Sequence, residues 1–270
     1  MYILLAALLA VACSKEARVA RPSEPSGEVD RRIVFGVDAT KVDAVNSDNL
    51  NQFYVLATTG NLDTQQKAWT SLAVKESSGK FCTGMYWPLT DPGYHFFASN
   101  AEPTLAGYVA GVDVDCTEDI VAGVLLYPAF ERTGSLSLSH VLARIGTVAV
   151  NSEKGYTLSD ITVTLSNVKT SGRYLLRTMS WSDTGTVASV PLTVGSNDIY
   201  LIPGYYPISI TATYTKGDYV NTITIDSSVT IHVGKINNLN IKLTNDPAIP
   251  IDFSVTLQDW AAKEINMVLS

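Results

Sequence analysis

Strict alternation of apolar and polar residues in the second half of the chain limits the fold more than any other feature. In "DITVTLSNV", Ile161, Val163 and Leu165 share one face of an extended chain, and Thr162 and Thr164 share the other. Successive side chains of a β-strand point to opposite faces, so this period of two gives the strand one apolar and one polar face. Such strands are typical of antiparallel sheets that pack face to face.

The same alternation recurs in further segments, separated by Gly, Asn, Asp and Pro at intervals of about 10–15 residues, as in β-sandwiches. We therefore predict an all-β fold of two tandem β-sandwich domains, residues 33–132 and 133–270. The apolar faces are predicted to hold Leu136, Leu138, His140 and Leu142; Ile208 and Ile210; Val229, Ile231 and Val233; Leu239, Ile241 and Leu243; and Ile251, Phe253, Val255 and Leu257.

The chain begins with an apolar run, "MYILLAALLAVAC", that ends at Cys13. A membrane-spanning helix needs about 20 apolar residues, so the run is too short to span a bilayer and fits a signal peptide over residues 1–13. Ala10, Val11 and Ala12 before Cys13 resemble a bacterial lipobox, in which the cysteine is lipidated. The alternative is an ordinary cleaved signal with an incidental cysteine. The polar residues 14–32, with their Pro and Gly, predict a tether.

Two further cysteines, Cys82 and Cys116, leave two alternatives open. In an exported protein an even pair can form a disulfide, which would contribute roughly 4 kcal/mol in the chain-entropy model. Two buried free thiols are equally consistent with the sequence. No histidine stands at metal-ligand spacing from either cysteine, so a metal site is not predicted.

Motifs for catalysis and for cofactors are missing from the sequence. His95, His140 and His232 belong to no metal-binding motif, and there is no nucleophile elbow, phosphate loop or dinucleotide fingerprint. His140 is predicted to be a satisfied core histidine, and His232 a surface residue. The formal net charge of −7 argues against a nucleic acid partner. We predict no enzyme activity, no cofactor and no metal.

Two clusters permit other interpretations. The acidic residues Asp113, Asp115, Glu118 and Asp119 form either a solvated turn or a calcium site, and a hydrolase would need such carboxylates paired across space. A set of aromatic residues either fills the core or forms a platform on which a surface lipoprotein stacks glycans. These residues are Trp69, Tyr86, Trp87, Tyr94, Phe96, Phe97, Tyr205 and Tyr206.

Several segments follow one another in a characteristic order. They are "IVFGVDATK", "FYVLATTG", "MYWPLTDPGYHFFASNAEP", "DIVAGVLLYPAFERTGSLSLSHVLARIGTVAV", "ITVTLSNVKTSGRY" and "FSVTLQDW". In this order they resemble the first strand with its loop, the second strand, the aromatic segment, the domain junction and the later strands of the fimbrillin family, the lipoprotein pilins of type V pili. The resemblance implies two transthyretin-like sandwich domains and an outer-membrane lipoprotein at the cell surface.

The resemblance also implies a fimbrial subunit (shaft, tip or anchor) that polymerises by strand exchange. A protease cuts behind the first strand, whose apolar residues here are Ile33, Phe35 and Val37, and the vacated slot accepts a strand of the next subunit. Lys41 follows this strand, whereas a cut at Arg32 would only trim the tether. The family usually has Arg at the cut. Either a different protease therefore acts at Lys41, or the subunit stays uncleaved as an anchor or terminal piece.

Two C-terminal segments are candidate donor strands. The tail "EINMVLS" offers Ile265, Met267 and Leu269 on one face, and we prefer it to "IDFSVTLQ" because a free end leaves its own subunit at low cost. The alternative for the tail is an ordinary last strand of the second domain. The implied partners are other pilin subunits, the outer membrane through the lipid anchor, a processing protease, and a host or bacterial surface receptor.

Overall fold

The structure is a computed structural model in which strands make up the regular secondary structure. Among the residues that it describes there is no helix, and therefore none that could cross a bilayer. The prediction of an all-β fold is confirmed. The residues described are 32–37, 50–88, 90, 93–126, 133–152, 156–246, 249–259 and 263–268.

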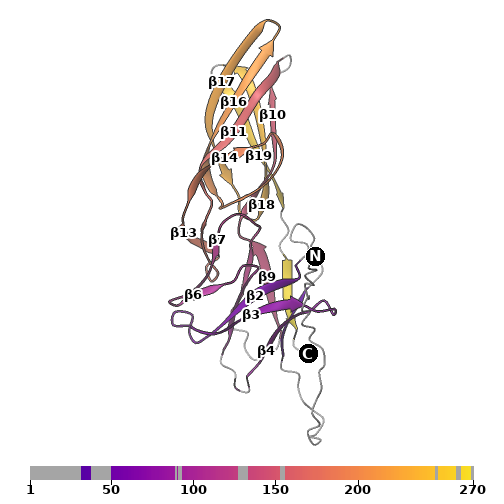
Figure 1. The fold of residues 1–270 in the computed structure, drawn as a ribbon, viewed down its shortest axis with the longest axis vertical. Coiled ribbons are helices and arrows are strands. Elements are labelled where there is room, and N and C mark those ends of the chain that lie inside the picture. Colours follow the sequence, from indigo (N-terminus) through magenta and orange to yellow (C-terminus); the bar gives the residue numbers. More distant parts are fainter. Residues whose placement is uncertain are drawn as a thin grey trace, which may run out of the picture. The chain divides into compact units, whose positions relative to one another are not determined.

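Eight strands close into a barrel in which every neighbouring pair is antiparallel (Figure 1). Their hydrogen-bonded order is β1-β20-β9-β8-β5-β2-β3-β4, and β4 pairs back to β1. In Figure 1 the yellow β20 lies among the indigo and purple strands from the start of the chain. The strands are β1 (Arg32–Val37), β2 (Gln52–Thr59), β3 (Gln66–Lys75), β4 (Phe81–Tyr86), β5 (His95–Ser99), β8 (Val121–Leu125), β9 (Thr133–His140) and β20 (Lys263–Val268).

Large apolar side chains fill the interior of the barrel. Phe53, Phe81, Phe96 and Leu136 are all fully buried there. Strand β5 is buried on both faces, since Phe97 points away from Phe96 into a second apolar cluster. A strand covered on both faces has no polar face to show, which explains why "HFFAS" is a nearly continuous apolar run.

A small sheet covers the outer side of the barrel strands β2, β5 and β8. Leu56, Phe97 and Ala122 from these strands pack with Val112 and Tyr174 from the small sheet. Its order is β13-β12-β7-β6. The strands are β6 (Thr104–Ala106), β7 (Val109–Val114), β12 (Gly172–Leu175) and β13 (Ser180–Thr184).

Two four-stranded sheets enclose the remaining core, and their strands match the predicted alternation. The predicted antiparallel pairing holds except between Ala143–Ser152 and Lys235–Asp246, which run parallel. Val163 and Ile208 from one sheet share a buried cluster with Leu239 and Ile241 from the other. The sheet orders are β15-β10-β18-β19 and β14-β11-β16-β17. The strands are β10 (Ala143–Ser152), β11 (Thr157–Lys169), β14 (Val187–Leu192), β15 (Gly195–Leu201), β16 (Gly204–Lys216), β17 (Tyr219–Ile231), β18 (Lys235–Asp246) and β19 (Ile249–Asp259). We call this pair of sheets the sandwich.

Two of the described side chains depart from their predicted faces. Leu142 lies beyond the end of β9 and packs in the apolar cluster outside the barrel, and not with Leu136 and Leu138. Val233 was expected to share the apolar face of Val229 and Ile231, but β17 ends at Ile231 and the Val233 side chain is 51% exposed. The alternation therefore holds within the strand and fails beyond its last residue.

The predicted boundary between residues 132 and 133 stays a prediction. Strand β9 begins at Thr133, and it pairs inside the barrel, as does β20 near the C-terminus. Strand β12 pairs with β7 across the same boundary. The chain thus returns twice to the sheets formed by its first part.

Candidate functional site: the first strand and its slot

Strand β1 is held on one edge by β4. Val34 lies opposite Cys82, and the register shifts between Arg32 and Val34, as at a bulge. At this irregular point the buried Thr83 hydroxyl donates a hydrogen bond to the Ile33 carbonyl at 3.0 Å. A side-chain hydroxyl thus supplies a backbone contact where the regular ladder is interrupted.

On its other edge β1 pairs antiparallel with β20, the C-terminal strand. Phe35 lies opposite Met267, and Val37 lies opposite Ile265. On the far side of β20, Ile265 lies opposite Leu136 of β9. The predicted removable residues and the predicted donor residues are therefore direct cross-strand neighbours within one chain. The third donor candidate, Leu269, lies outside the described residues.

The side chains of β1 belong to the barrel core. Ile33 and Phe35 are fully buried, and the Phe35 ring packs edge-on against Phe53 and Phe96 with centroid distances of 5.8 Å to each. Burying one such side chain stabilises a fold by about 1.5–3 kcal/mol, and each aromatic pair adds about 0.5–1.5 kcal/mol. Strand β1 is thus a structural part of the barrel.

Of the predicted processing and lipidation residues, only Arg32 is among the described residues. Arg32 is the first residue of β1, half-buried and opposite Tyr86 of β4. Lys41 and Cys13 lie outside the described residues. Cleavage and lipidation at these positions therefore stay predictions.

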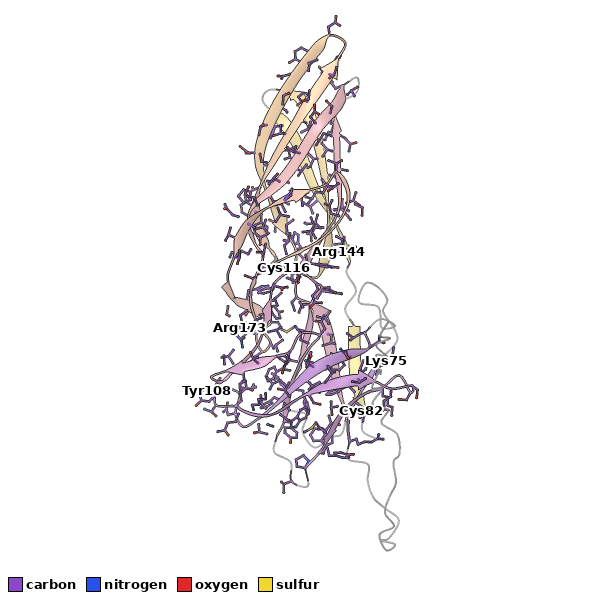
Figure 2. The ribbon with its side chains drawn as sticks, in the orientation of Figure 1. Lys75, Cys82, Tyr108, Cys116, Arg144 and Arg173 are labelled. Carbon is purple, nitrogen blue, oxygen red and sulfur yellow. The ribbon has the colours of Figure 1, made fainter. Side chains whose placement is uncertain are left out.

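The two cysteines are free thiols at separate places in the fold (Figure 2). Cys82 is on β4 beside β1, whereas Cys116 follows β7 and packs against the apolar cluster outside the barrel. Burial raises the pKa of the Cys116 thiol to about 12. Of the two alternatives from the sequence, free thiols describe the structure, although both are half-buried and not fully buried as predicted.

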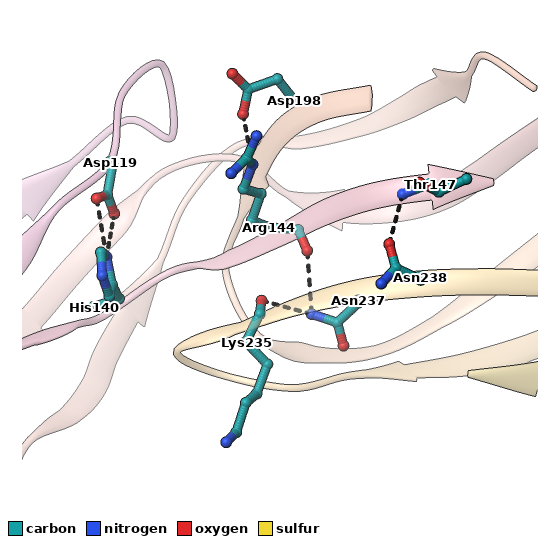
Figure 3. A network of polar contacts seen from close by, with 8 residues as sticks. All are labelled: Asp119, His140, Arg144, Thr147, Asp198, Lys235, Asn237 and Asn238. Atoms are coloured by element: carbon teal, nitrogen blue, oxygen red, sulfur yellow. Dashed lines mark hydrogen bonds and ion pairs between the residues drawn. The ribbon is translucent and has the colours of Figure 1, made fainter. Parts of the chain in front are cut away.

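The two buried histidines have structural partners. His140 is buried, and its Nδ1 lies 2.9 Å from the Asp119 carboxylate (Figure 3). The buried His95 ring contacts the Gly60 carbonyl at 2.9 Å, and His232 is exposed. The prediction of a satisfied core histidine at 140 and a surface histidine at 232 is confirmed.

The acidic cluster serves separate contacts. Asp113 pairs with Arg173 at 3.0 Å, and the Asp115 carboxylate accepts a hydrogen bond from the Thr117 hydroxyl at 2.6 Å, which lowers the pKa of Asp115. Asp119 pairs with His140, as described above. In the described part of the chain no group of His, Cys, Asp and Glu converges as a metal site would.

Most of the aromatic residues fill the core. Tyr94 and Phe96 are buried, and the half-buried rings of Trp69 and Trp87 pack against Phe96 with centroid distances of 5.9 and 5.8 Å. Tyr206 is also buried, and its hydroxyl donates to the Ile202 carbonyl. The exposed rings are those of Tyr86 and Tyr205, on different strands of different sheets. The aromatics therefore do not gather into one stacking platform.

A polar network around Asn237 was not predicted from the sequence (Figure 3). The fully buried Asn237 amide accepts a hydrogen bond from the His232 backbone N–H at 2.9 Å and donates to the Lys235 and Arg144 carbonyls. The network ties the turn before β18 to β10. Two adjacent asparagines in "GKINNLN" are typical of an exposed turn, so no local signal marks this buried one.

A model of the fimbrillin-like family matches residues 39–260, and the chain belongs to this family. The family is structural and adhesive rather than enzymatic, which makes the protein a subunit of a cell-surface fimbrium. The matched range begins after β1 and ends before β20.

Solved structures of Bacteroides proteins are similar to the chain. A candidate cell adhesion protein from Bacteroides uniformis is 18% identical, with a TM-score of 0.48 over 88% of this chain and 100% of that one. One from Bacteroides eggerthii is 14% identical, with a TM-score of 0.47 over 87% and 93%. One from Bacteroides ovatus is 15% identical, with a TM-score of 0.40 over 87% and 89%. No curated protein matches the chain.

Proposed function

We propose that the protein is a lipid-anchored fimbrial subunit that assembles by strand exchange at β1. The observation that carries the proposal is that β1 completes a closed barrel while Ile33 and Phe35 are fully buried in its core. A closed barrel has no free strand edge. Removing β1 would give β4 and β20 one unpaired edge each, with an apolar slot between them.

The vacated slot would bind another strand strongly. A donor that reburies two large apolar side chains in place of Ile33 and Phe35 gains about 1.5–3 kcal/mol for each, together with backbone hydrogen bonds to both edges. Because side chains alternate along a strand, the donor needs apolar residues at every second position. The tail with Ile265, Met267 and Leu269 meets this requirement.

Loss of β1 would also weaken the hold on the donor strand. Strand β20 pairs with β1 on one edge and with β9 on the other. Without β1 it keeps only the pairing with β9, and a strand at a sheet edge opens more readily than an enclosed one. One cut would therefore open the acceptor slot and loosen the donor.

The position of the cut decides what remains of the subunit. Cleavage after Lys41 separates the body from β1, from the tether and from the lipid at Cys13, so the cleaved subunit would be free to join a polymer. Cleavage after Arg32 leaves Ile33 and Phe35 on the body and the slot filled. An uncleaved subunit would keep its lipid and serve as an anchor.

Limited proteolysis of the full, detergent-solubilised chain tests the proposal. A lysine-specific protease is expected to release a fragment that ends at Lys41 and to produce a ladder of polymers on gels. The Lys41→Ala variant should give neither, whereas the matched Arg32→Ala variant should assemble as the wild type does. Mass spectrometry of the fragment also reports acylation at Cys13. Cleavage at Lys41 without polymers, or polymers from Lys41→Ala, would contradict the proposal.

A further inference from the structure

Strand β17 forms a long outer edge of the sandwich, far in sequence from β1. It runs over Tyr219–Ile231, 13 residues, and it is the last strand in the order β14-β11-β16-β17. Its pairing with β16 runs without a register shift from Lys216 opposite Tyr219 to Gly204 opposite Ile231. In the described part of the chain β17 has no hydrogen-bonded strand on its other side.

The features that usually protect such an edge are missing from β17. Soluble proteins commonly place charges, prolines or bulges on long edge strands, because the unpaired backbone groups otherwise recruit another strand. Strand β17 contains no Pro, Lys or Arg, and Asp226 is its one charged residue. A regular, nearly neutral edge of this length is a template for strand addition.

The hairpin that joins β16 to β17 fixes which residues point their backbone groups outward. Gly217 and Asp218 form a two-residue loop, and Gly217 has a φ of +60°. In a two-residue hairpin the flanking residues, Lys216 and Tyr219, are a hydrogen-bonded pair, and the pairs then alternate along the ladder. Thr222 and Thr224 therefore direct their N–H and C=O groups away from β16.

Two further observations agree with this assignment. The Thr211 and Thr224 hydroxyls lie 2.9 Å apart, as do those of Thr213 and Thr222, which suits the close side chains of non-hydrogen-bonded pairs. Pro207 falls at the same type of position on β16, where its missing N–H removes no bond to β17.

The outer face beside this edge carries rows of threonines. Thr162 of β11 lies opposite Thr211 of β16, which lies opposite Thr224 of β17. The row crosses three strands and ends at the edge. A strand with hydroxyl side chains could extend this row beside β17, because hydroxyls are neutral and both donate and accept hydrogen bonds.

We propose that β17 pairs antiparallel with β17 of a second copy of this chain, about a two-fold axis beside Thr224. The β14-β11-β16-β17 sheets of the two copies would then form one continuous sheet. This axis places Asp226 opposite Thr222 of the other copy, so the single charge of each edge meets a hydroxyl and not another carboxylate. A self-complementary edge suits a two-fold contact, and subunits of a fimbrium are crowded with copies of themselves. The contact uses neither β1 nor β20 and needs no cleavage.

Sedimentation of the full, uncleaved, detergent-solubilised chain over a concentration series tests this contact. The wild type and Lys41→Ala should both form dimers. Thr224→Pro removes an outward N–H and leaves the bonds to β16 intact, and it should weaken dimerisation at least about tenfold. Thr224→Lys adds a charge to the edge and should act in the same direction. The matched control is Thr162→Lys, on the same face and in the same row but on an inner strand, and it should dimerise as the wild type does.

The outcomes separate the possible contacts, with circular dichroism showing that each variant is folded. Loss of dimers in the Thr224 variants alone supports the edge contact. A monomeric wild type overturns it. Equal weakening by Thr224→Lys and Thr162→Lys assigns the contact to the outer face of the sheet and overturns the edge contact. Dimers that none of these substitutions weakens would also overturn the edge contact. Loss of dimers in Lys41→Ala would overturn it too and would assign association to strand exchange.

Discussion

The barrel and the sandwich treat their strand edges in opposite ways. The barrel closes on itself, and it does so by placing the first and last of the described strands, β1 and β20, side by side. The described sandwich is open, with β14, β15, β17 and β19 as outermost strands. Loss of an outermost strand from an open sheet replaces one edge by another, whereas loss of β1 from the barrel creates two edges where there were none. Closure is what makes the loss of one strand consequential.

Truncation of a core side chain in each region gives the largest expected effect. Phe35→Ala in the barrel should lower the free energy of unfolding by about 3–5 kcal/mol, and Leu165→Ala in the sandwich by about 2–5 kcal/mol. Both residues are fully buried, and urea unfolding measures the two losses. If closure matters as described, hydrogen exchange at β20 should become faster in Phe35→Ala and stay unchanged in Leu165→Ala. Equal protection of β20 in both variants would contradict the importance of barrel closure.

A matched pair of glycines gives a smaller effect. A Cβ at Gly123 would lie 2.1 Å from the Ser137 carbonyl oxygen on the neighbouring barrel strand, so Gly123→Ala should force backbone apart and cost about 1–3 kcal/mol. A Cβ at Gly146 in the sandwich would meet side chains, Asn238 Oδ1 at 2.5 Å and Ile236 Cγ2 at 2.6 Å. Side chains can rotate away, at the loss of about one hydrogen bond worth ~1 kcal/mol. Thermal unfolding should show the barrel variant as the less stable, and the reverse order would count against a tightly closed barrel.

Alkylation of the two cysteines perturbs the fold least of these three tests. With a pKa of about 12, the Cys116 thiol is almost entirely protonated at pH 8. It should react on the order of a thousandfold more slowly than an unperturbed cysteine, and about tenfold faster for each pH unit gained up to that pKa. Cys82 lies opposite Val34 of β1, so its alkylation should accelerate when β1 is removed, while Cys116 stays slow. Peptide mass spectrometry follows both sites, and an unchanged Cys82 rate after loss of β1 would contradict the proposed slot.

The sequence predicted the sandwich strands better than the barrel closure. In β11 and β16 one face meets water, so apolar and polar residues alternate and Val163, Leu165, Ile208 and Ile210 are identified as core from local pattern alone. The pairing of β1 with β20 has no such signal. A strand's own residues show which face is buried, but its partner is set by the path of the whole chain.

Prediction of the site was likewise limited by what local patterns contain. Ile33 and Phe35 were predicted as plugging residues, and both are fully buried. Thr83 was missed, because a threonine inside a strand is common and its contact with the Ile33 carbonyl depends on a register shift. Asn237 was missed because only three-dimensional packing distinguishes a buried asparagine near the start of a strand from one in an exposed turn.

The meeting of β1 with β20 has a consequence for how the molecule folds. Phe35 and Met267 are neighbours in space but lie far apart in the sequence. Chains are synthesised from the N-terminus, and contacts between residues distant in sequence carry a loop-closure cost that makes them form late. The barrel can therefore close only after Lys263–Val268 has been synthesised, and a chain interrupted before this segment would leave β1 and β9 without the strand that joins them.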